Sequence, residues 1–264
     1  MTIAAADPGT ARAATDECIR VVGFDLDGTL AESKSAMGPV MAGLLEALLD
    51  RMHVLIISGG AWPQFEGQVL GRLSLDADRA ARLHLMPTCG TSYLQWGGTG
   101  WETVYAHDLD PDVRARIAGA IEASARELGV WEPEPYGDRI EDRGSQITFS
   151  ALGQQAPLDE KHTWDPDGTK RRALRARVAA RLPDLEVRAG GSTSIDVTEQ
   201  GIDKAFGLSE LMARLGASPD EVLFVGDALH PGGNDHPVKR LGVATHPVEG
   251  PDDTVRLIQQ LLAA

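Results

Sequence analysis

The stretch "VVGFDLDGTLAES", residues 21–33, joins an apolar, β-branched run to two aspartates, Asp25 and Asp27, and a glycine, Gly28. Runs of this kind are typical of buried strands, and a glycine directly after acidic residues is typical of a turn. An acidic pair at the end of a strand is ordinary in a solvated turn. It indicates chemistry only if distant parts of the chain supply a lysine, a hydroxyl group and further acids at the same place.

The spacing of apolar residues predicts a parallel sheet at both ends of the chain. Residues 37–51 carry apolar side chains at helical spacing, and "HVLIISGG" (53–60) is a second continuous apolar run that ends in glycines. Strand, helix and strand in this order form a βαβ unit. The last third repeats the pattern with a helix over 203–215, a strand over 221–227 and a helix near 252–262. We therefore expect an α/β fold with a doubly wound, Rossmann-like parallel sheet.

The middle of the chain has a different period. Alternating segments flank the glycine-rich turn at 97–100, and two more lie at 140–152 and 185–199. Amphipathic helices are expected over 111–128 and 168–181. Alternation is typical of an antiparallel sheet that is covered on one face, which predicts an inserted α/β cap domain. The expected divisions are a mobile tail (1–20), the first part of the core (21–90), the cap (91–199) and the second part of the core (200–264).

Composition limits the possible partners. The 264 residues carry a net charge of −14, which argues against a nucleic-acid-binding surface, since phosphate backbones are bound by clustered Lys and Arg. Cys18 and Cys89 are far apart and form no CxxC-type motif, so no zinc site or disulfide framework is indicated. No signal peptide or membrane-spanning apolar run is recognisable. These features predict a cytoplasmic, soluble protein with neither membrane nor nucleic acid as a partner.

Polar residues follow several of the predicted strands. In parallel α/β sheets, ligands bind beyond the carboxyl ends of the strands. Asp25 and Asp27, Ser58 and Asp227 each follow a predicted strand, and Lys204 opens a predicted helix. Crowded carboxylates repel one another and ordinarily hold a hard divalent cation such as Mg²⁺. Together with Lys204, such a cation would make a phosphate receptor in which one carboxylate acts as nucleophile and another as general acid and base.

Four segments of the chain resemble the motifs of a known superfamily. "DLDGTL", "ISGG", Lys204 and "GDALHPGGND" are similar, in order, to the four motifs of the haloacid dehalogenase superfamily of phosphotransferases. The insertion between the second and third motifs resembles a type IIB cap. "IEDRGS", "GGSTSIDV", "EQGIDKAFGL" and "GDALHPGGNDH" further resemble the eukaryotic-type phosphomannomutase group. The resemblance extends from residue 21 to the end of the chain and implies phosphoryl transfer on a small phosphorylated metabolite such as a sugar phosphate.

The resemblance also implies a role for individual residues. Asp25 would carry a transient aspartyl phosphate, and Asp27 would protonate the leaving oxygen and later activate the acceptor. Ser58 and Lys204 would hold the transferring phosphoryl oxygens. The Mg²⁺ site would comprise Asp25, the backbone carbonyl of Asp27, Asp227 and Asp235. The substrate-binding positions would be Gly59, Lys34, Arg143, Lys161, Ser194, Asp196 and Asn234.

Three positions depart from the phosphomannomutase pattern. Lys34, Gln154 and Lys161 stand where that group has arginines. A mutase must retain a bisphosphate intermediate, and lysine or glutamine does not reproduce the bidentate grip of an arginine on phosphate. The departures therefore favour a phosphatase, with water as the acceptor, over a phosphomannomutase-like mutase. A non-catalytic sugar-phosphate-binding protein is a third alternative, but it would not need both Asp25 and Asp27.

Simpler structural roles remain open for several residues. Arg143 and Lys161 are also explained as surface charges, and Asp196 as a charge on an edge strand. His230 and His236 flank the glycine-rich loop, but without a third ligand they are better explained as loop residues than as a metal site.

The resemblance bears on oligomeric state as well. Members with this type of cap often pair through it, and the helix expected over 111–128 is amphipathic. A homodimer formed through the cap is therefore one expectation. The alternative is that the apolar stripe of this helix faces its own sheet.

Overall fold

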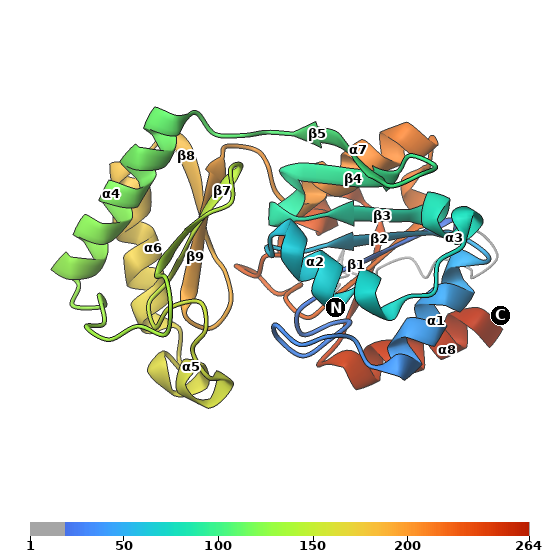
Figure 1. Ribbon diagram of the computed structural model, residues 1–264, viewed down its shortest axis with the longest axis horizontal. Coiled ribbons are helices and arrows are strands. Elements are labelled where there is room, and N and C mark those ends of the chain that lie inside the picture. Colours follow the sequence, from blue (N-terminus) through green and yellow to red (C-terminus); the bar gives the residue numbers. More distant parts are fainter. Residues whose placement is uncertain (1–18, 264) are drawn as a thin grey trace, which may run out of the picture.

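The structure is a computed structural model that describes residues 19–263, in which a core and a cap lie side by side (Figure 1). The predicted tail over 1–20 falls outside the described residues except for its last two. The core holds a seven-stranded sheet whose first five strands in spatial order are parallel, as expected for the α/β class. In that order the strands are β11 (Ala244–Pro247), β10 (Val222–Gly226), β1 (Val21–Phe24), β2 (His53–Ile57), β3 (Leu83–Met86), β4 (Ser92–Trp96) and β5 (Trp101–Ala106).

The hairpin β4–β5 belongs to the core, so the predicted boundary of the cap at residue 91 is wrong. β4 pairs antiparallel with β3, with Leu85 opposite Leu94, and thereby extends the parallel sheet. Alternation of apolar and polar residues marks any strand with one exposed face, including an edge hairpin added to a parallel sheet. The pattern therefore could not assign the hairpin to one sheet or the other. The cap begins only after β5.

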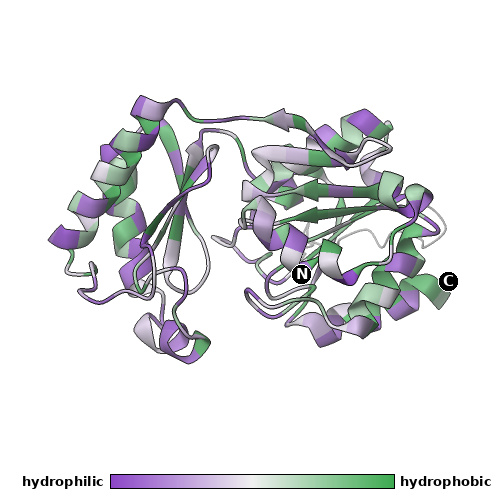
Figure 2. Cartoon of the chain, viewed as in Figure 1, coloured by the Kyte–Doolittle hydropathy of each residue, from purple (hydrophilic) through white to green (hydrophobic). Residues whose placement is uncertain are grey.

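Helices cover both faces of the core sheet, as a doubly wound fold requires. The helices α1 (Pro39–Leu49) and α8 (Pro251–Ala263) bury Leu45 and Ile258 in the same cluster of apolar side chains on one face. On the other face, α7 (Lys204–Leu215) and the 3₁₀ segment η5 (His236–Leu241) bury Leu211 and Val238. Figure 2 shows the hydrophobic residues concentrated along the central strands. The smaller core elements are α2 (Trp62–Gln68), η2 (Leu70–Arg72), α3 (Ala77–Arg82), η3 (Thr88–Gly90) and η4 (Pro219–Glu221).

The cap is a four-stranded antiparallel sheet with two helices on the face turned away from the core and a third, short helix beyond one end of the sheet (Figure 1). Its strands are, in spatial order, β6 (Ile140–Asp142), β7 (Gln146–Ser150), β9 (Ser194–Glu199) and β8 (Leu185–Ala189), and its helices are α4 (Pro111–Glu127), α5 (Leu158–Trp164) and α6 (Thr169–Arg181). The segment 140–152, expected as one strand, is two strands joined by a turn in which Arg143 N donates to Gln146 O at 2.9 Å.

The apolar stripe of α4 packs inside the cap. Ile117 and Ile121 are fully buried and belong to the same cluster as Phe149 of the cap sheet. The amphipathic pattern is therefore accounted for within one chain, and a homodimer through the cap stays a prediction. Within residues 19–263, no helix combines the length and the apolar character needed to cross a membrane.

Three polar side chains form a chain across β2, β3 and β4. His53 Nδ1 lies 3.0 Å from His84 Nε2, and His84 Nδ1 lies 2.8 Å from the Tyr93 hydroxyl. His84 is fully buried, and burial, together with the neighbouring charges of His53 and Arg214, lowers its pKa to about 3. The ring therefore stays neutral in the folded protein at all ordinary pH values.

The burial of neutral His84 predicts that the protein loses stability in acid. The unfolded chain binds a proton at His84 below pH about 6.5, whereas the folded chain does so only near pH about 3, so the free energy of unfolding falls as pH falls between these values. The contribution of one such group is about 1.4 kcal/mol per pH unit. Urea unfolding at several pH values should show a slope that is smaller by this amount in His84→Gln. The exposed His162→Gln is the control, and equal slopes in wild type and His84→Gln would contradict the prediction.

Candidate active site

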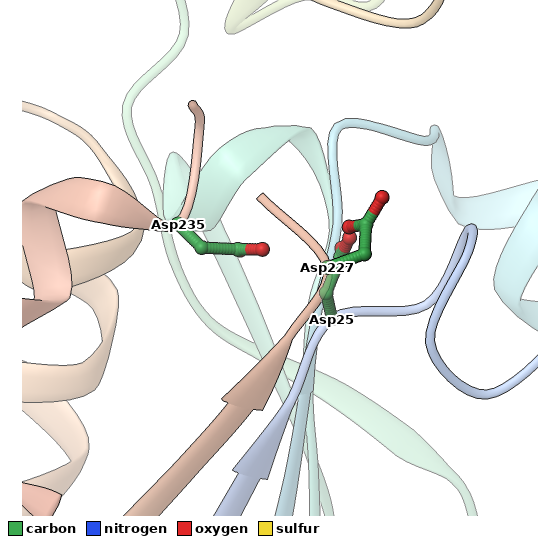
Figure 3. A group of neighbouring side chains, drawn as sticks. All are labelled: Asp25, Asp227 and Asp235. Atoms are coloured by element: carbon green, nitrogen blue, oxygen red, sulfur yellow. The ribbon is translucent and has the colours of Figure 1, made fainter. Parts of the chain in front are cut away.

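Three carboxylates meet at the carboxyl ends of the central strands (Figure 3). Asp25 follows β1, Asp227 follows β10, and Asp235 precedes η5; their oxygens lie within 4.8 Å of one another. β1 and β10 are parallel neighbours, which brings the residues after them to the same edge of the sheet. Asp25 and Asp235 are buried, with 4% and 0% of their surface exposed.

The turn after β1 depends on Gly28. Its φ is +83°, a conformation that glycine adopts easily, and a Cβ at this position would lie only 2.8 Å from Asp227 Oδ2. Glycine therefore lets the loop after Asp27 close against the carboxylate of the neighbouring strand. Any larger residue would displace one of the two.

Lys204 is buried among the carboxylates. Its Nζ donates to Asp25 Oδ1 at 2.6 Å and to Asp235 Oδ1 at 2.7 Å, and only 1% of its surface is exposed. Burial alone would lower its pKa, but Asp235 and Asp25 outweigh burial and raise it, so the ammonium stays charged. Asp203 fixes the start of α7 by accepting a hydrogen bond from the Phe206 amide at 3.0 Å.

The cluster of three carboxylates, Asp25, Asp227 and Asp235, fits a hard divalent cation. Burial raises the pKa of Asp25 well above its usual range, against the opposing effect of Lys204 and with a further rise caused by Asp235 and Asp227. Burial and Asp235 also raise the pKa of Asp227. One ammonium is too little positive charge for three crowded carboxylates. A set of carboxylate oxygens without sulfur or nitrogen ligands is the type that Mg²⁺ binds.

The Asp27 carboxylate lies apart from this cluster. Its Oδ1 accepts a hydrogen bond from the Lys34 amide at 2.7 Å, and its Oδ2 accepts one from Gln64 Nε2 at 2.8 Å. Binding of a cation by the backbone carbonyl of Asp27 stays a prediction. Gln64, at the start of α2, is a site residue that the sequence analysis missed. Its position shortly after the "ISGG" strand end was the available signal.

One pocket between the core and the cap joins most of the predicted residues. Ser58 follows β2, is buried, and accepts a hydrogen bond from the Gly60 amide at 3.3 Å. Lys204 and Asp235 lie behind Asp25, while Lys161 is not part of the pocket wall. The predicted residues that line the pocket are Asp25, Asp27, Lys34, Ser58, Gly59, Arg143, Ser194, Asp196, Asp227 and Asn234.

Cap side chains reach the core at Gly59. Its carbonyl oxygen accepts hydrogen bonds from Arg143 Nη1 and, at 3.1 Å, from Gln146 Nε2. Gln146 and Thr148 also donate to Asp196 Oδ1, at 3.1 and 2.7 Å. Burial raises the pKa of Asp196. Arg143 and Asp196 are thus buried contacts of the pocket, not the solvated surface charges that the sequence left open.

Three cations, Lys34, Arg143 and Lys161, lie close together, and we call them the basic cluster. Lys34 and Arg143 line the pocket. Lys34 Nζ donates to the Gln154 carbonyl at 2.9 Å and to its side-chain oxygen at 3.0 Å, and Lys161 Nζ donates to the same carbonyl at 3.4 Å. Burial, Lys161 and Arg143 lower the pKa of Lys34 to about 8. Burial also lowers the pKa of Lys161. Gln154 therefore joins the two lysines. Although it replaces an arginine of the phosphomannomutase pattern, two positive charges lie next to it.

Solved structures share this architecture. An IMP-nucleotidase from Plasmodium falciparum superposes with a TM-score of 0.72 at 16% identity, over 94% of this chain and 69% of that one. A haloacid dehalogenase-like hydrolase from Bacteroides thetaiotaomicron superposes with a TM-score of 0.58 at 16% identity, over 92% and 99% of the two chains. Identities this low establish the fold alone. The fold, a parallel core sheet with an inserted cap, is that of haloacid dehalogenase-like hydrolases.

Sequence comparison narrows the class. The sequence model of the family described as "Eukaryotic phosphomannomutase" matches residues 129–264, more than half of the chain. A probable phosphomannomutase of Caenorhabditis elegans is 26% identical over 251 residues, covering 90% of this chain and 94% of that protein. Phosphomannomutase 1 of Homo sapiens is 25% identical over 251 residues, covering 90% of each chain. The chain belongs to the eukaryotic phosphomannomutase family.

Proposed function

We propose that the protein moves a phosphoryl group between two hydroxyl groups of a hexose phosphate, as a mutase of the phosphomannomutase type. The observation that carries this proposal is a single pocket lined both by Asp25, whose carboxylate Lys204 contacts, and by Lys34 and Arg143 of the basic cluster. Relatives that align over 90% of the chain are named phosphomannomutases. This supports the mutase better than the phosphatase that the sequence analysis favours, because the basic cluster keeps three cations despite the substitutions.

Asp25 and Asp27 are proposed to share the chemistry. An oxygen of Asp25 attacks phosphorus, the bond from phosphorus to the ester oxygen breaks, and Asp27 gives its proton to that leaving oxygen. In the second half, Asp27 takes the proton of the accepting hydroxyl, whose oxygen attacks phosphorus as the bond to Asp25 breaks. Lys204 orients the Asp25 carboxylate and opposes the rise in its pKa that burial causes. Asp25, Asp227 and Asp235 would hold a divalent cation, which would supply charge neutralisation for the phosphoryl group.

The far end of the substrate is proposed to occupy the basic cluster. A second phosphate there would take hydrogen bonds from Lys34, Arg143 and Lys161, while Ser194 and Asp196 contact sugar hydroxyl groups. A mutase must bind its bisphosphate in either orientation, so this end needs affinity for phosphate without chemistry. Charge-assisted hydrogen bonds supply such affinity.

Hydrolysis is the second candidate, and a specific observation favours it. Lysine ammonium groups lack the fork with which arginine holds phosphate bidentately, and Gln154 supplies no charge. Two of the three cations also have lowered pKa values. A bisphosphate held in this way would dissociate more readily, and water would then accept the phosphoryl group from Asp25.

Phosphorus NMR separates the two reactions in one tube. Hexose 1-phosphates would be incubated with the protein, Mg²⁺ and a trace of the hexose 1,6-bisphosphate. The proposal predicts that the 6-phosphate signal grows faster than that of inorganic phosphate. Faster growth of inorganic phosphate would replace the mutase by a phosphatase. No change with any hexose phosphate or with an aryl phosphate would favour a non-catalytic binding protein.

The basic cluster predicts a pH-dependent KM. Lys34 loses its charge as pH rises through about 8, because burial and its cationic neighbours depress its pKa. The KM for a hexose phosphate should therefore rise about tenfold between pH 7 and 9, as one charge-assisted contact is lost. In Lys34→Arg the guanidinium stays charged, and the rise should disappear. If KM rose with pH in Lys34→Arg as it does in the wild type, a group other than Lys34 would be responsible for the rise.

A further inference from the structure

A second cavity, of about 340 Å³, lies beside the active-site pocket. One wall is the first part of α6 with Arg171, Arg172 and Arg175, and another is the core loop 228–234. The two cavities share Gly190, Ala228 and Asn234 as lining residues, and the remaining walls differ. The second cavity therefore spans cap and core on the side of the loop that leads to Asp235.

Two arginines of this cavity, Arg172 and Arg175, lack, among the described residues, the acidic partners that the arginines of α6 outside the cavity have. Arg177 and Arg181, outside the cavity, form ion pairs with Glu127. Arg172 donates only to neutral acceptors, the Asp167 carbonyl at 2.7 Å and Thr169 Oγ1 at 2.9 Å. Arg175 makes no ion pair within residues 19–263. The same helix thus pairs Arg177 and Arg181 with an acid, whereas Arg172 and Arg175, which face the cavity, have no ion pair within residues 19–263.

The third arginine is fixed in place by its own contacts. Arg171 Nε lies 3.1 Å from the carboxylate of buried Asp165, and its Nη1 donates to the Gly191 carbonyl at 2.7 Å. The lining holds no carboxylate among the described residues, although the chain as a whole carries a net charge of −14. Arg172 and Arg175, two guanidinium groups without an acidic partner in the described chain beside the fixed Arg171, are suited to an anion, and planar guanidinium groups bind phosphate oxygens in pairs.

We infer that this cavity binds a dianionic phosphate group, at a site separate from the reaction centre. Both inorganic phosphate and the phosphate of an organic metabolite offer this chemistry. A bound phosphate would contact α6 of the cap and the 228–234 loop of the core at once. Its binding therefore stabilises the arrangement in which the cap lies against the core. Binding of phosphate at this cavity needs no turnover at Asp25.

Amide NMR in EDTA tests the inference without Mg²⁺ or catalysis. Inorganic phosphate would be titrated into ¹⁵N-labelled protein at low salt while the signals of Gly232, Gly233 and the Arg175 side chain are followed. These signals should shift together with one Kd. In Arg172→Gln/Arg175→Gln the Kd should rise about tenfold or more, because two charged donors are lost. Arg177→Gln, on the same helix but outside the cavity, should bind as the wild type does.

The outcomes separate the possibilities. A hexose 6-phosphate that binds more tightly than inorganic phosphate assigns the cavity to a metabolite, and the reverse order assigns it to inorganic phosphate; both support the site. Shifts confined to the surroundings of Lys34 and Gln154 would overturn it, because the anion would then occupy the basic cluster alone. An unchanged Kd in Arg172→Gln/Arg175→Gln would overturn it as well.

Discussion

Asp25→Asn is expected to lower the rate of phosphoryl transfer by about 10⁴-fold or more, because an amide keeps the shape of the carboxylate but cannot act as the nucleophile. Asp25 lies at the end of β1, and its Oδ1 accepts a hydrogen bond from Lys204 Nζ at 2.6 Å. The initial rate with a hexose 1-phosphate and Mg²⁺, measured by coupled assay, checks this expectation.

The fold should survive that substitution. Asn at position 25 removes one charge from a crowded group whose pKa burial already raises, so the free energy of unfolding should stay the same or increase. Asp252→Asn, an exposed carboxylate at the start of α8, is the matched control and should keep full activity. Turnover in Asp25→Asn that equals the control would remove the covalent intermediate from the mechanism.

Asp27→Asn is expected to have the second largest effect, a rate lower by about 10²–10⁴-fold, the usual range for a lost general acid and base. Its carboxylate accepts hydrogen bonds from the Lys34 amide and from Gln64. It is not one of the three carboxylates that form the cluster. We therefore expect Asp27 to contribute by proton transfer and not by binding a cation through its side chain.

The leaving group gives this prediction a sharper test. In a single turnover, p-nitrophenyl phosphate expels an oxygen that needs no proton, so phosphorylation of Asp25 should be nearly as fast in Asp27→Asn as in the wild type. With a hexose phosphate the same step should be slow. Equal losses with the two esters would show that Asp27 acts by position or charge and not as an acid.

Strand ends were the most predictable part of the molecule. Asp25 and Asp227 follow continuous apolar runs, and parallel neighbours bring their carboxyl ends to one edge whatever the details of packing. Lys204 required more, because it lies 179 residues from Asp25 in the chain. Before the structure, only the resemblance in the order of the motifs predicted that Lys204 and Asp25 lie in the same site.

Comparison of single positions with the phosphomannomutase pattern could not predict the basic cluster. Replacing arginine by lysine or glutamine at single positions reads as a loss of charge and of fork geometry. The structure instead brings Lys34 and Lys161 onto one carbonyl oxygen, that of Gln154, with Arg143 beside them. Such compensation depends on side-chain positions across the boundary between core and cap. Gln64 was missed for the same reason, since its position shortly after "ISGG" does not by itself identify it as a partner of Asp27.

Trapping the phosphorylated protein tests the central claim most directly. The protein would be mixed with a ³²P-labelled hexose 1,6-bisphosphate and Mg²⁺, quenched in acid within one turnover, and digested for tandem mass spectrometry. Trypsin releases residues 21–34 as one peptide, and fragmentation separates Asp25 from Asp27. We predict a single phosphate on Asp25 that hydroxylamine removes and that Asp25→Asn lacks. Phosphate on Ser58 or Asp27, or steady turnover with no labelled peptide, would contradict phosphoryl transfer through Asp25.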